Sequence, residues 1–283
     1  MATLAQNLPS LAGKVALVTG STDGLGRMVA VELAAAGAFV IVHGRDQARG
    51  TATLDEITTR GGTGTFERAD LASLDEVRQL ADAVVRRTEP LHILVNNAGI
   101  GTAHRGDQRS VSRDGFELRF AVNYLAGFLL TRLLLPTLRA SAPARIVNVA
   151  SIGQMPIEFD DIMLEHGYSG MRAYCQSKLA QIMDGFELAR ELHDTGVTIN
   201  SLHPATYMAT TMVREAGVKP ASSVEEGARA VLQLAASTAL EGHSGEYYEG
   251  LTAARANPQA YDVAARARLR AVSAELTGLE QPT

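Results

Sequence analysis

The sequence predicts a single α/β domain over residues 1–283, with a doubly wound, Rossmann-type parallel sheet. Short apolar runs rich in β-branched residues alternate with segments of helical periodicity, and no Pro-rich or Ser-rich linker or internal repeat divides the chain. Strands buried on both faces read as continuous apolar runs, and neighbouring parallel strands need helical crossovers. Five runs predict strands, at residues 15–19, 39–43, 93–96, 146–150 and 197–202.

The segments between these runs predict helices. The first helix follows the first strand and ends near Gly37. Within residues 71–87, apolar residues recur at steps of three and four, which marks one buried helix face. These residues are Leu74, Val77, Leu80, Ala81 and Val84. Residues 124–135 are predicted to form a buried helix, which is interrupted by Arg132 and stopped by Pro136.

Two regions depart from this alternation. Residues 152–171 contain Pro156, Gly167 and Gly170 and follow neither period. The residues after Gly250 are rich in Ala and Arg and predict a helical C-terminal tail, 250–283, whose helix covers 258–276.

Composition and charge narrow the class of protein. With 46% hydrophobic and 20% charged residues the chain is of globular type, and its net charge of −5 without a basic stripe argues against a nucleic-acid partner. Residues 1–13 lack the basic start and long apolar run of a signal peptide, so we expect a cytoplasmic protein without a membrane partner. The single cysteine, Cys175, excludes an intrachain disulfide, and no metal site is predicted.

A glycine-rich loop directly follows the first predicted strand. A sharp strand-to-helix turn needs the free φ of glycine, and a pyrophosphate approaching the backbone needs a surface without Cβ atoms and the unpaired N–H groups of a helix start. A glycine-rich turn without a ligand is the alternative, but the place between a first strand and a first helix favours a dinucleotide. The candidate cofactor-binding residues here are Gly20, Ser21, Thr22, Asp23, Gly24, Leu25 and Gly26.

The end of the second predicted strand bears on which dinucleotide binds. Gly44 stands where an NAD-binding protein usually has a carboxylate for the ribose 2′-hydroxyl, and Arg45 follows it. An arginine suits the 2′-phosphate of NADP, and Arg27 could reach the same phosphate. Asp46 keeps NAD(H) open, because a small shift of the strand end would bring its carboxylate near the ribose. We therefore predict NADP(H) with NAD(H) as the alternative, and leave His43 as either a ligand or a strand-end residue.

Tyr174 and Lys178 are candidate proton-transfer residues. Four residues apart on a helix, they share one face. A free phenol has a pKa of about 10, and a nearby ammonium favours the phenolate and lowers that pKa, which makes the pair a plausible general acid/base. Ser151 ends a predicted strand, where its hydroxyl could hold a substrate oxygen. The structural alternatives are a surface Tyr–Lys pair on a helix and a serine that caps a helix or ends a turn.

Three motifs together resemble the short-chain dehydrogenase/reductase family in order and spacing, over about residues 14–248. They are the glycine-rich loop, Asn96-Asn97-Ala98-Gly99 and Tyr174-Cys175-Gln176-Ser177-Lys178. The resemblance implies that Tyr174 passes the proton, that Lys178 also binds the nicotinamide ribose and that Ser151 orients the substrate oxygen. Cys175 is then read as a packing neighbour.

The resemblance also assigns supporting residues. Asn123 matches the family's asparagine that holds a water for proton relay, although it could equally be a core amide. Asp70 matches the aspartate beside the adenine. The remaining residues that it implies along the cofactor are Leu71, Asn96, Asn97, Ala98 and Gly99.

Two departures from the family pattern concern cofactor and substrate. Ser151 and Tyr174 are 23 residues apart, a longer interval than in most single-domain members. The extra segment resembles the branch with retinol dehydrogenases and protochlorophyllide reductases, whose members commonly use NADP(H).

The second departure follows the last predicted strand, where Pro204 is succeeded by Ala205 rather than by the family's glycine. Thr206, Thr210 and Thr211 compete for the nicotinamide amide, and we select Thr206 together with Pro204. Residues 204–222 are predicted to form an apolar substrate lid, with core packing as the alternative.

The resulting functional prediction is an NADP(H)-dependent oxidoreductase, such as a carbonyl reductase, acting on a carbonyl or alcohol of a small, apolar substrate. The alternative from another class is a non-catalytic dinucleotide-binding redox sensor, and epimerisation or dehydration on the same fold is a third. Family members often form homo-oligomers through two long helices, here expected at 112–138 and 173–193, although both faces could be buried within one subunit.

Overall fold

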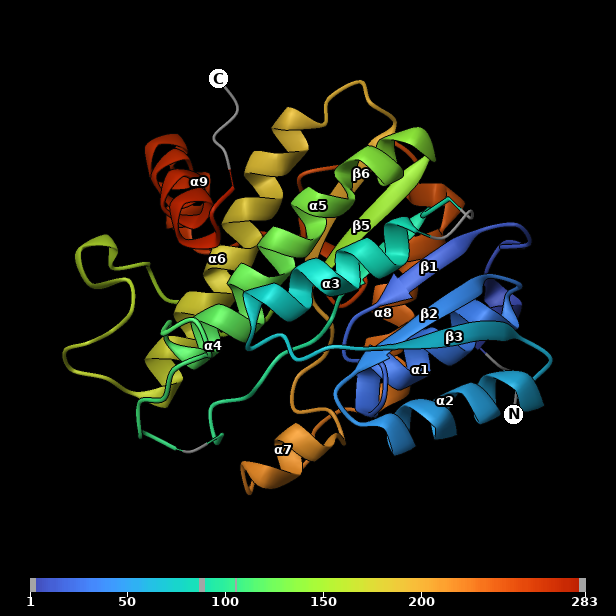
Figure 1. Cartoon of the computed structure of the whole chain (residues 1–283), viewed down its shortest axis with the longest axis horizontal. Coiled ribbons are helices and arrows are strands. Elements are labelled where there is room, and N and C mark those ends of the chain that lie inside the picture. The colour runs from blue at the N-terminus through green and yellow to red at the C-terminus, as the bar shows by residue number, and fades with distance from the viewer. Residues whose placement is uncertain (1–3, 87–89, 105, 280–283) are drawn as a thin grey trace.

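The computed structural model describes residues 4–86, 90–104 and 106–279, and it confirms the predicted fold (Figure 1). One eight-stranded sheet has the order β3-β2-β1-β4-β5-β6-β7-β8, in which only β8 runs antiparallel to its neighbour. The strands are β1 (Val15–Val18), β2 (Phe39–Gly44), β3 (Thr63–Arg68), β4 (Ile93–Asn96), β5 (Ala144–Val149), β6 (Val197–His203), β7 (Tyr247–Glu249) and β8 (Thr252–Ala254). Since strand order reverses beside β1, the carboxyl ends of β1 and β4 open the crevice in which such sheets bind ligands.

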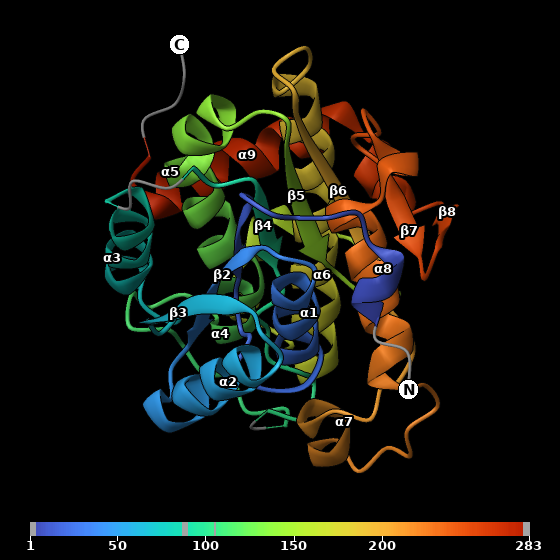
Figure 2. The same ribbon diagram turned by 90° about the vertical axis from the view of Figure 1, so that its right-hand side faces the viewer.

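Helices cover both faces of the sheet (Figure 2). Alternate residues of β1 face opposite sides: Ala16 and Val18 join the core under α1 and α8, whereas Val15 and Leu17 join the core under α3 and α5. The helices are α1 (Gly24–Ala35), α2 (Gln47–Thr59), α3 (Leu74–Val85), α4 (Leu118–Phe120), α5 (Ala126–Ala140), α6 (Gly170–Glu191), α7 (Thr211–Glu215), α8 (Val224–Ala236) and α9 (Val263–Thr277). A π-helical turn, η2 (Ala121–Leu125), joins α4 to α5 without a break.

Several predicted boundaries were wrong. The helix expected at 112–138 begins only at Leu118, because Val111 and Glu117 form a β-bridge that closes the preceding residues into a turn. Pro136 does not stop its helix, which runs on to Ala140. The first residues of the expected helical tail form β8, and a 3₁₀ turn (Pro258–Tyr261) precedes α9. Parts of three predicted segments lie outside the described residues. They are residues 1–3 of the N-terminus, Arg87 at the end of the segment 71–87, and residues 280–283 of the tail.

The C-terminal helix α9 packs along α6. Arg266 pairs with Glu187 at 3.3 Å and Arg270 pairs with Glu191 at 2.9 Å, while the Tyr124 and Ser273 hydroxyls lie 2.7 Å apart. Part of the α6 surface considered for subunit pairing is therefore covered within the chain itself. The continuous helix Leu118–Ala140 is long and apolar enough to cross a membrane, but 67% of its apolar window is buried inside the protein.

Candidate active site

The glycine-rich loop packs directly against the segment that follows β4. Gly20 has a φ of +63°, and a Cβ on it would lie 2.8 Å from the Ala98 Cα. A Cβ on Gly26 would lie 2.3 Å from the Asn97 Nδ2, which donates to the Thr19 carbonyl over 2.8 Å. Both glycines are thus required for the close approach of the two segments that were predicted to line the cofactor.

The side chains of this loop hold the loop itself. The Ser21 hydroxyl is fully buried, donates to the Val18 carbonyl over 2.6 Å and accepts from the His43 amide over 2.9 Å. Leu25 lies in the core. Asp23 caps α1 by accepting from the Gly24 amide over 2.8 Å. The side chains of Ser21 and Leu25 would therefore serve a dinucleotide site only by holding the loop backbone in place.

His43 supports the loop from the end of β2. Its Nδ1 accepts from the Gly20 amide over 3.1 Å, and its Nε2 faces the Ala69 carbonyl at 3.2 Å. Burial lowers the pKa of His43 to about 4, against a smaller opposing effect of the bond to Ala69. Of the two interpretations left open above, the structure supports the strand-end residue, because both ring nitrogens are occupied by backbone groups.

The end of β2 presents arginines rather than a carboxylate. A Cβ on Gly44 would lie 2.6 Å from the Thr22 Cγ2, so the usual acid position has no room for a side chain. Asp46 caps α2 and accepts from the Arg49 amide over 3.0 Å. The Arg45 side chain is 66% exposed, with its guanidinium 3.8 Å from a carboxylate oxygen of Asp70.

Arg27 and Asp70 are both tied to neighbouring groups. Arg27 forms an ion pair with Glu56 of α2 at 2.7 Å, an interaction that the sequence did not suggest. Asp70 accepts from the Ala72 amide over 3.0 Å and lies 3.9 Å from the Arg113 guanidinium, and Leu71 beside it is buried. Asp70 therefore lies at the same edge as Arg45, as the predicted adenine and ribose sites require.

Tyr174, Ser151 and Lys178 come together at the carboxyl end of β5. Ser151 follows β5, and Tyr174 and Lys178 lie on α6. Burial raises the pKa of the Tyr174 phenol, and a hydrogen bond with the Ser151 side chain partly offsets this rise. Lys178 is 4% exposed, and burial lowers its pKa to about 8.

The expected electrostatic link between Tyr174 and Lys178 is not what perturbs these groups in the structure. The Lys178 Nζ donates to the Val149 carbonyl over 2.7 Å and to the Gln181 Oε1 over 3.3 Å. The net shift of the Tyr174 pKa is upward, because burial outweighs the opposing hydrogen bond. The prediction that Lys178 lowers the pKa of the Tyr174 phenol was therefore wrong for the protein without a bound cofactor.

Asn123 lies in the π-helical turn, 2% exposed, and holds the loop after β4. Its Oδ1 accepts from the Ile100 amide over 2.8 Å, and its Nδ2 donates to the Ile100 carbonyl over 3.2 Å and to the Ser177 hydroxyl over 3.0 Å. A Cβ on Gly99 would lie 3.2 Å from the Asn123 Oδ1 and 3.6 Å from the Lys178 Nζ. The absence of a side chain at Gly99 thus leaves open a space bordered by both.

The predicted lid crosses from β6 to the glycine-rich loop. Pro204 is buried, and the Thr206 Oγ1 lies 3.0 Å from the His203 Nε2. Thr210 caps α7, whereas Thr211 donates to Asp23 over 2.7 Å. All three competing threonines thus have partners, and Thr206 is the one that is exposed at the start of the segment.

The middle of the lid contacts the loop after β4. A Cβ on Gly101 would lie 2.6 Å from the Met212 Cγ, so Met212 packs directly on that loop. Tyr207 adopts a φ of +46° and is exposed. Together with the Asp23–Thr211 bond, the Met212 contact joins the lid to both segments predicted to line the cofactor, the glycine-rich loop and the loop after β4.

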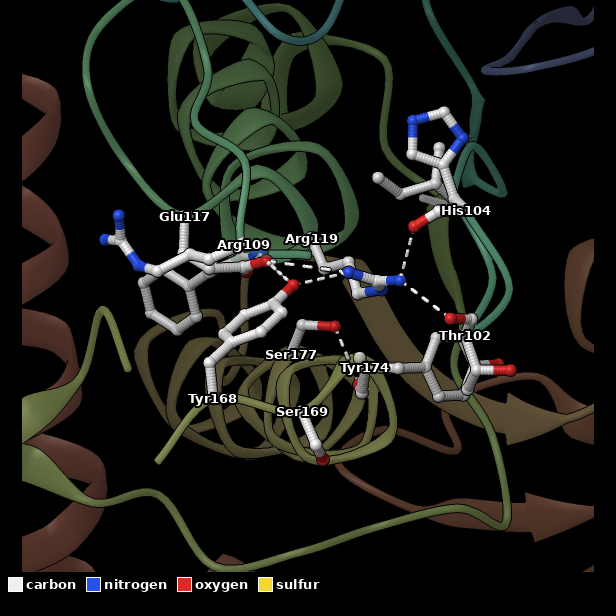
Figure 3. A network of polar contacts seen from close by, with 12 residues as sticks. Thr102, His104, Arg109, Glu117, Arg119, Tyr168, Ser169, Tyr174 and Ser177 are labelled. Carbon is white, nitrogen blue, oxygen red and sulfur yellow. Dashed lines mark hydrogen bonds and ion pairs between the residues drawn. The ribbon is translucent and has the colours of Figure 1, made fainter. Parts of the chain in front are cut away.

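Two sets of residues around the site were not predicted. Tyr247 and Gln154 both donate to the Ser151 carbonyl, over 3.2 and 3.0 Å. Arg119 is buried at the centre of a polar network with Glu117 and Tyr168 (Figure 3). The signal that could have found the network is a charged residue in a largely apolar helix, four positions before Asn123.

Comparisons with known proteins identify the family of the chain. Residues 14–220 match the short chain dehydrogenase family. Human retinol dehydrogenase 13 is 37% identical, covering 97% of this chain and 87% of the relative, and human retinol dehydrogenase 12 is also 37% identical, covering 95% and 88%.

Two solved structures are similar to this chain in fold. A crystal structure of an uncharacterised protein from Mycobacterium paratuberculosis has a TM-score of 0.81 and 31% identity, covering 99% of this chain and 98% of the other. An NADP active-site complex of RhlG from Pseudomonas aeruginosa has a TM-score of 0.69 and 29% identity, covering 88% and 97%. This chain belongs to the short-chain dehydrogenase family of oxidoreductases, which bind a nicotinamide dinucleotide and act on an alcohol or carbonyl group.

Proposed function

We propose that this protein is an NADP(H)-preferring oxidoreductase that interconverts a carbonyl and an alcohol on a small apolar molecule. The observation that carries the cofactor preference is the end of β2, where Thr22 fills the space that a carboxylate at position 44 would need. Arg45 follows with its guanidinium largely in solvent. An exposed arginine beside a position without an acid suits a 2′-phosphate, which a carboxylate would repel.

The rest of the groove fits a dinucleotide. The α1 N-terminus offers backbone N–H groups, and Gly20 and Gly26 let the loop in front of it pack closely on the segment after β4. Asp46, the residue that kept NAD(H) open, is engaged in capping α2. At the other end, the space in front of Gly99 is bordered by the Asn123 Oδ1 and by the Lys178 ammonium, which donates to two protein acceptors and has a third N–H suited to a ribose hydroxyl.

In carbonyl reduction, the bound dinucleotide supplies the hydride. The Tyr174 phenol gives its proton to the substrate oxygen, and burial keeps that phenol protonated near neutral pH. The Ser151 hydroxyl donates a hydrogen bond to the same oxygen. Tyr247 and Gln154 hold the Ser151 backbone through its carbonyl, which fixes the direction of that hydroxyl.

Exposed apolar side chains favour an apolar substrate. Ile152 follows Ser151 directly and is 53% exposed. The exposed Met171 and Met155 both contact Cys175, the residue after Tyr174, through the Met171 sulfur and the Met155 amide. Met212 approaches from the lid. Large exposed apolar residues gathered around polar groups are typical of a site for an apolar ligand. The relatives named retinol dehydrogenases act, by their names, on an apolar alcohol, which supports this proposal.

The experiment that tests the cofactor preference is a binding titration with NADPH and with NADH, followed by nicotinamide fluorescence. We expect NADPH to bind more tightly, and Arg45→Asp to weaken NADPH roughly 10- to 100-fold while leaving NADH unchanged, since a charge-assisted bond is worth about 1.5–3 kcal/mol. Arg139→Asp is the control. It makes the same change of charge, but at the end of α5 that leads into the amino end of β5. Tighter binding of NADH to the wild type would refute the proposed preference.

A further inference from the structure

The buried Arg119 side chain binds the loop after β4 through several carbonyl groups at once. Its Nε donates to the Gly101 carbonyl over 3.1 Å. One terminal nitrogen lies 2.7 Å from the Thr102 carbonyl, 2.6 Å from that of His104 and 3.2 Å from that of Gly106 (Figure 3). A guanidinium presents five N–H donors in a fixed plane, so one side chain can fix several turns of an irregular loop.

The same helical face holds the start of this loop. Asn123, four residues after Arg119, binds both the amide and the carbonyl of Ile100. The two side chains therefore engage backbone groups of residues 100, 101, 102, 104 and 106 in succession. We call Arg119, Glu117 and Tyr168 the Arg119 clamp, since the other terminal nitrogen of Arg119 donates to the Tyr168 hydroxyl, which donates to Glu117 over 2.9 Å.

The Arg119 clamp joins the loop to the start of the catalytic helix. Tyr168 belongs to the segment between β5 and α6, and Tyr174 follows six residues later. At the first residue of α6, a Cβ on Gly170 would lie 2.5 Å from the Gly106 carbonyl and 2.8 Å from Arg119. The Gly170 amide in turn donates to Asp107 over 2.8 Å. The beginning of α6 is thus seated on the loop that Arg119 holds.

Burial makes the clamp an obligatory arrangement. The side chains of Arg119 and Glu117 are each 1% exposed, and their charged atoms lie 3.9 Å apart. A buried guanidinium without its acceptors, or a buried carboxylate without its donors, is strongly unfavourable, so these groups have one arrangement in which all are satisfied. Gly101, whose carbonyl accepts from Arg119, also packs against Met212 of the lid, because a Cβ on it would lie 2.6 Å from the Met212 Cγ. The clamp therefore also reaches the segment proposed to cover the substrate.

From these contacts we propose that Arg119 is a positioning residue for the reaction. It fixes residues 100–104, 106 and 107 against the start of α6, and so sets the distance between these loop residues, beside which the substrate would lie, and the Tyr174 hydroxyl. Within the part of the chain that the structure describes, its hydrogen bonds and ion pair reach neither the glycine-rich loop nor the arginines at the end of β2. The inference rests on the proposed function, because it concerns placement of the substrate beside Tyr174.

The test compares Arg119→Met, Arg119→Lys and Tyr168→Phe with the wild type. We expect Arg119→Met to lower kcat/KM about 100-fold for retinal or a medium-chain aldehyde, because a small misplacement of reacting groups costs about that much, with the NADPH Kd unchanged. Tyr168→Phe removes the hydroxyl that accepts from Arg119 and donates to Glu117, and should lower kcat/KM about 3- to 10-fold. Arg119→Lys keeps the charge without the planar fork and should fall between the two.

Hydrogen–deuterium exchange gives a readout that does not require turnover. In Arg119→Met and Tyr168→Phe, the amides of residues 100–104, 106–107 and 168–173 should exchange faster, while those of β1, β2 and α1 keep their wild-type rates. Arg132→Met is the matched control, since Arg132 also forms a buried ion pair, with Asp184 at 2.7 Å, but between α5 and α6. It should destabilise the fold without raising exchange in the loop.

The outcomes distinguish failure of the Arg119 clamp from failure of the proposed function. Faster exchange confined to the loop and the α6 start, with loss of kcat/KM, would support the clamp. Unchanged exchange there, or acceleration spread equally over β1 and β2, would overturn it. A wild type that binds NADPH but turns over no carbonyl or alcohol would refute the proposed function, and the exchange pattern would still decide whether Arg119 holds the loop.

Discussion

The two ends of the proposed cofactor site differ in how deeply their charged and polar side chains are buried. At the catalytic end, Lys178 and Asn123 are 4% and 2% exposed, and backbone groups occupy much of their hydrogen-bonding capacity. At the other end, the Arg45 and Arg49 side chains are 66% and 60% exposed, with carboxylates no closer than 3.7 Å in their recorded ion pairs. The side chains at the catalytic end are held in place by burial and hydrogen bonds, whereas those at the arginine end can act on a ligand mainly through their charge.

This difference sets the size of the effects that each end can have. Buried groups act at low local polarity, where charge and hydrogen bonds are strong and where burial itself shifts pKa values. Exposed charges are weakened by water and by salt. The catalytic end should therefore decide whether turnover occurs, and the arginine end should adjust which dinucleotide is preferred.

The largest expected effect is that of Tyr174→Phe. Removing the proton donor should lower kcat about a thousandfold, within the range that general acid catalysis contributes. The NADPH Kd should stay at its wild-type value, because the substitution removes one hydroxyl and keeps the ring. Steady-state kinetics with a fluorescence titration measures both quantities, and turnover near the wild-type rate would remove Tyr174 from its assigned role.

The next effect concerns the pH dependence of stability and comes from Lys178. Its folded pKa of about 8 lies below its ordinary value of 10.5, so between these pH values the unfolded chain binds more protons than the folded one. The contribution of Lys178 to the free energy of unfolding should therefore rise as the pH increases from 8 to 10.5, by up to about 3 kcal/mol, and should be lost as the pH falls through 8.

Urea unfolding of the wild type and of Lys178→Met across this pH range isolates the effect, since other titrating groups are common to both proteins. The wild type should gain stability relative to the variant as the pH rises. A difference that is independent of pH would mean that burial does not lower the pKa of Lys178. It would also remove the contrast between the buried lysine and the exposed arginines.

The same contrast explains what the sequence could predict. The strands that contain Leu17 and Ile41 are fully buried, and such strands are continuous apolar runs in the sequence. All five predicted strands are present in the structure. β3 was missed because it is an edge strand, mostly half-exposed, with polar residues such as Thr63 and Glu67. β7 and β8 are only three residues each, too short to show a period.

The candidate site divides in a similar way. Tyr174 and Lys178 were identified from their spacing on a helix and Ser151 from its place at a strand end, whereas Asn123 was assigned through the family resemblance. The pairing of Arg27 with Glu56 and the carbonyl ligands of Arg119 depend on segments far apart in the chain. Such tertiary contacts leave no local pattern, and they decide which charges remain available for a ligand.

The smallest expected effect is the salt dependence of NADPH binding. Raising the ionic strength from about 0.1 M to 1 M shortens the screening length from about 10 Å to about 3 Å, which weakens the attraction between exposed arginines and a 2′-phosphate. Since exposed ion pairs contribute about 0.2–1 kcal/mol, the NADPH Kd should rise roughly threefold more than the NADH Kd. Equal salt dependence of the two dinucleotides would argue that a buried group, not Arg45 or Arg49, recognises the phosphate. Loss of the difference in Arg45→Asp would identify Arg45 as the residue that carries it, because that variant keeps every buried contact of the catalytic end.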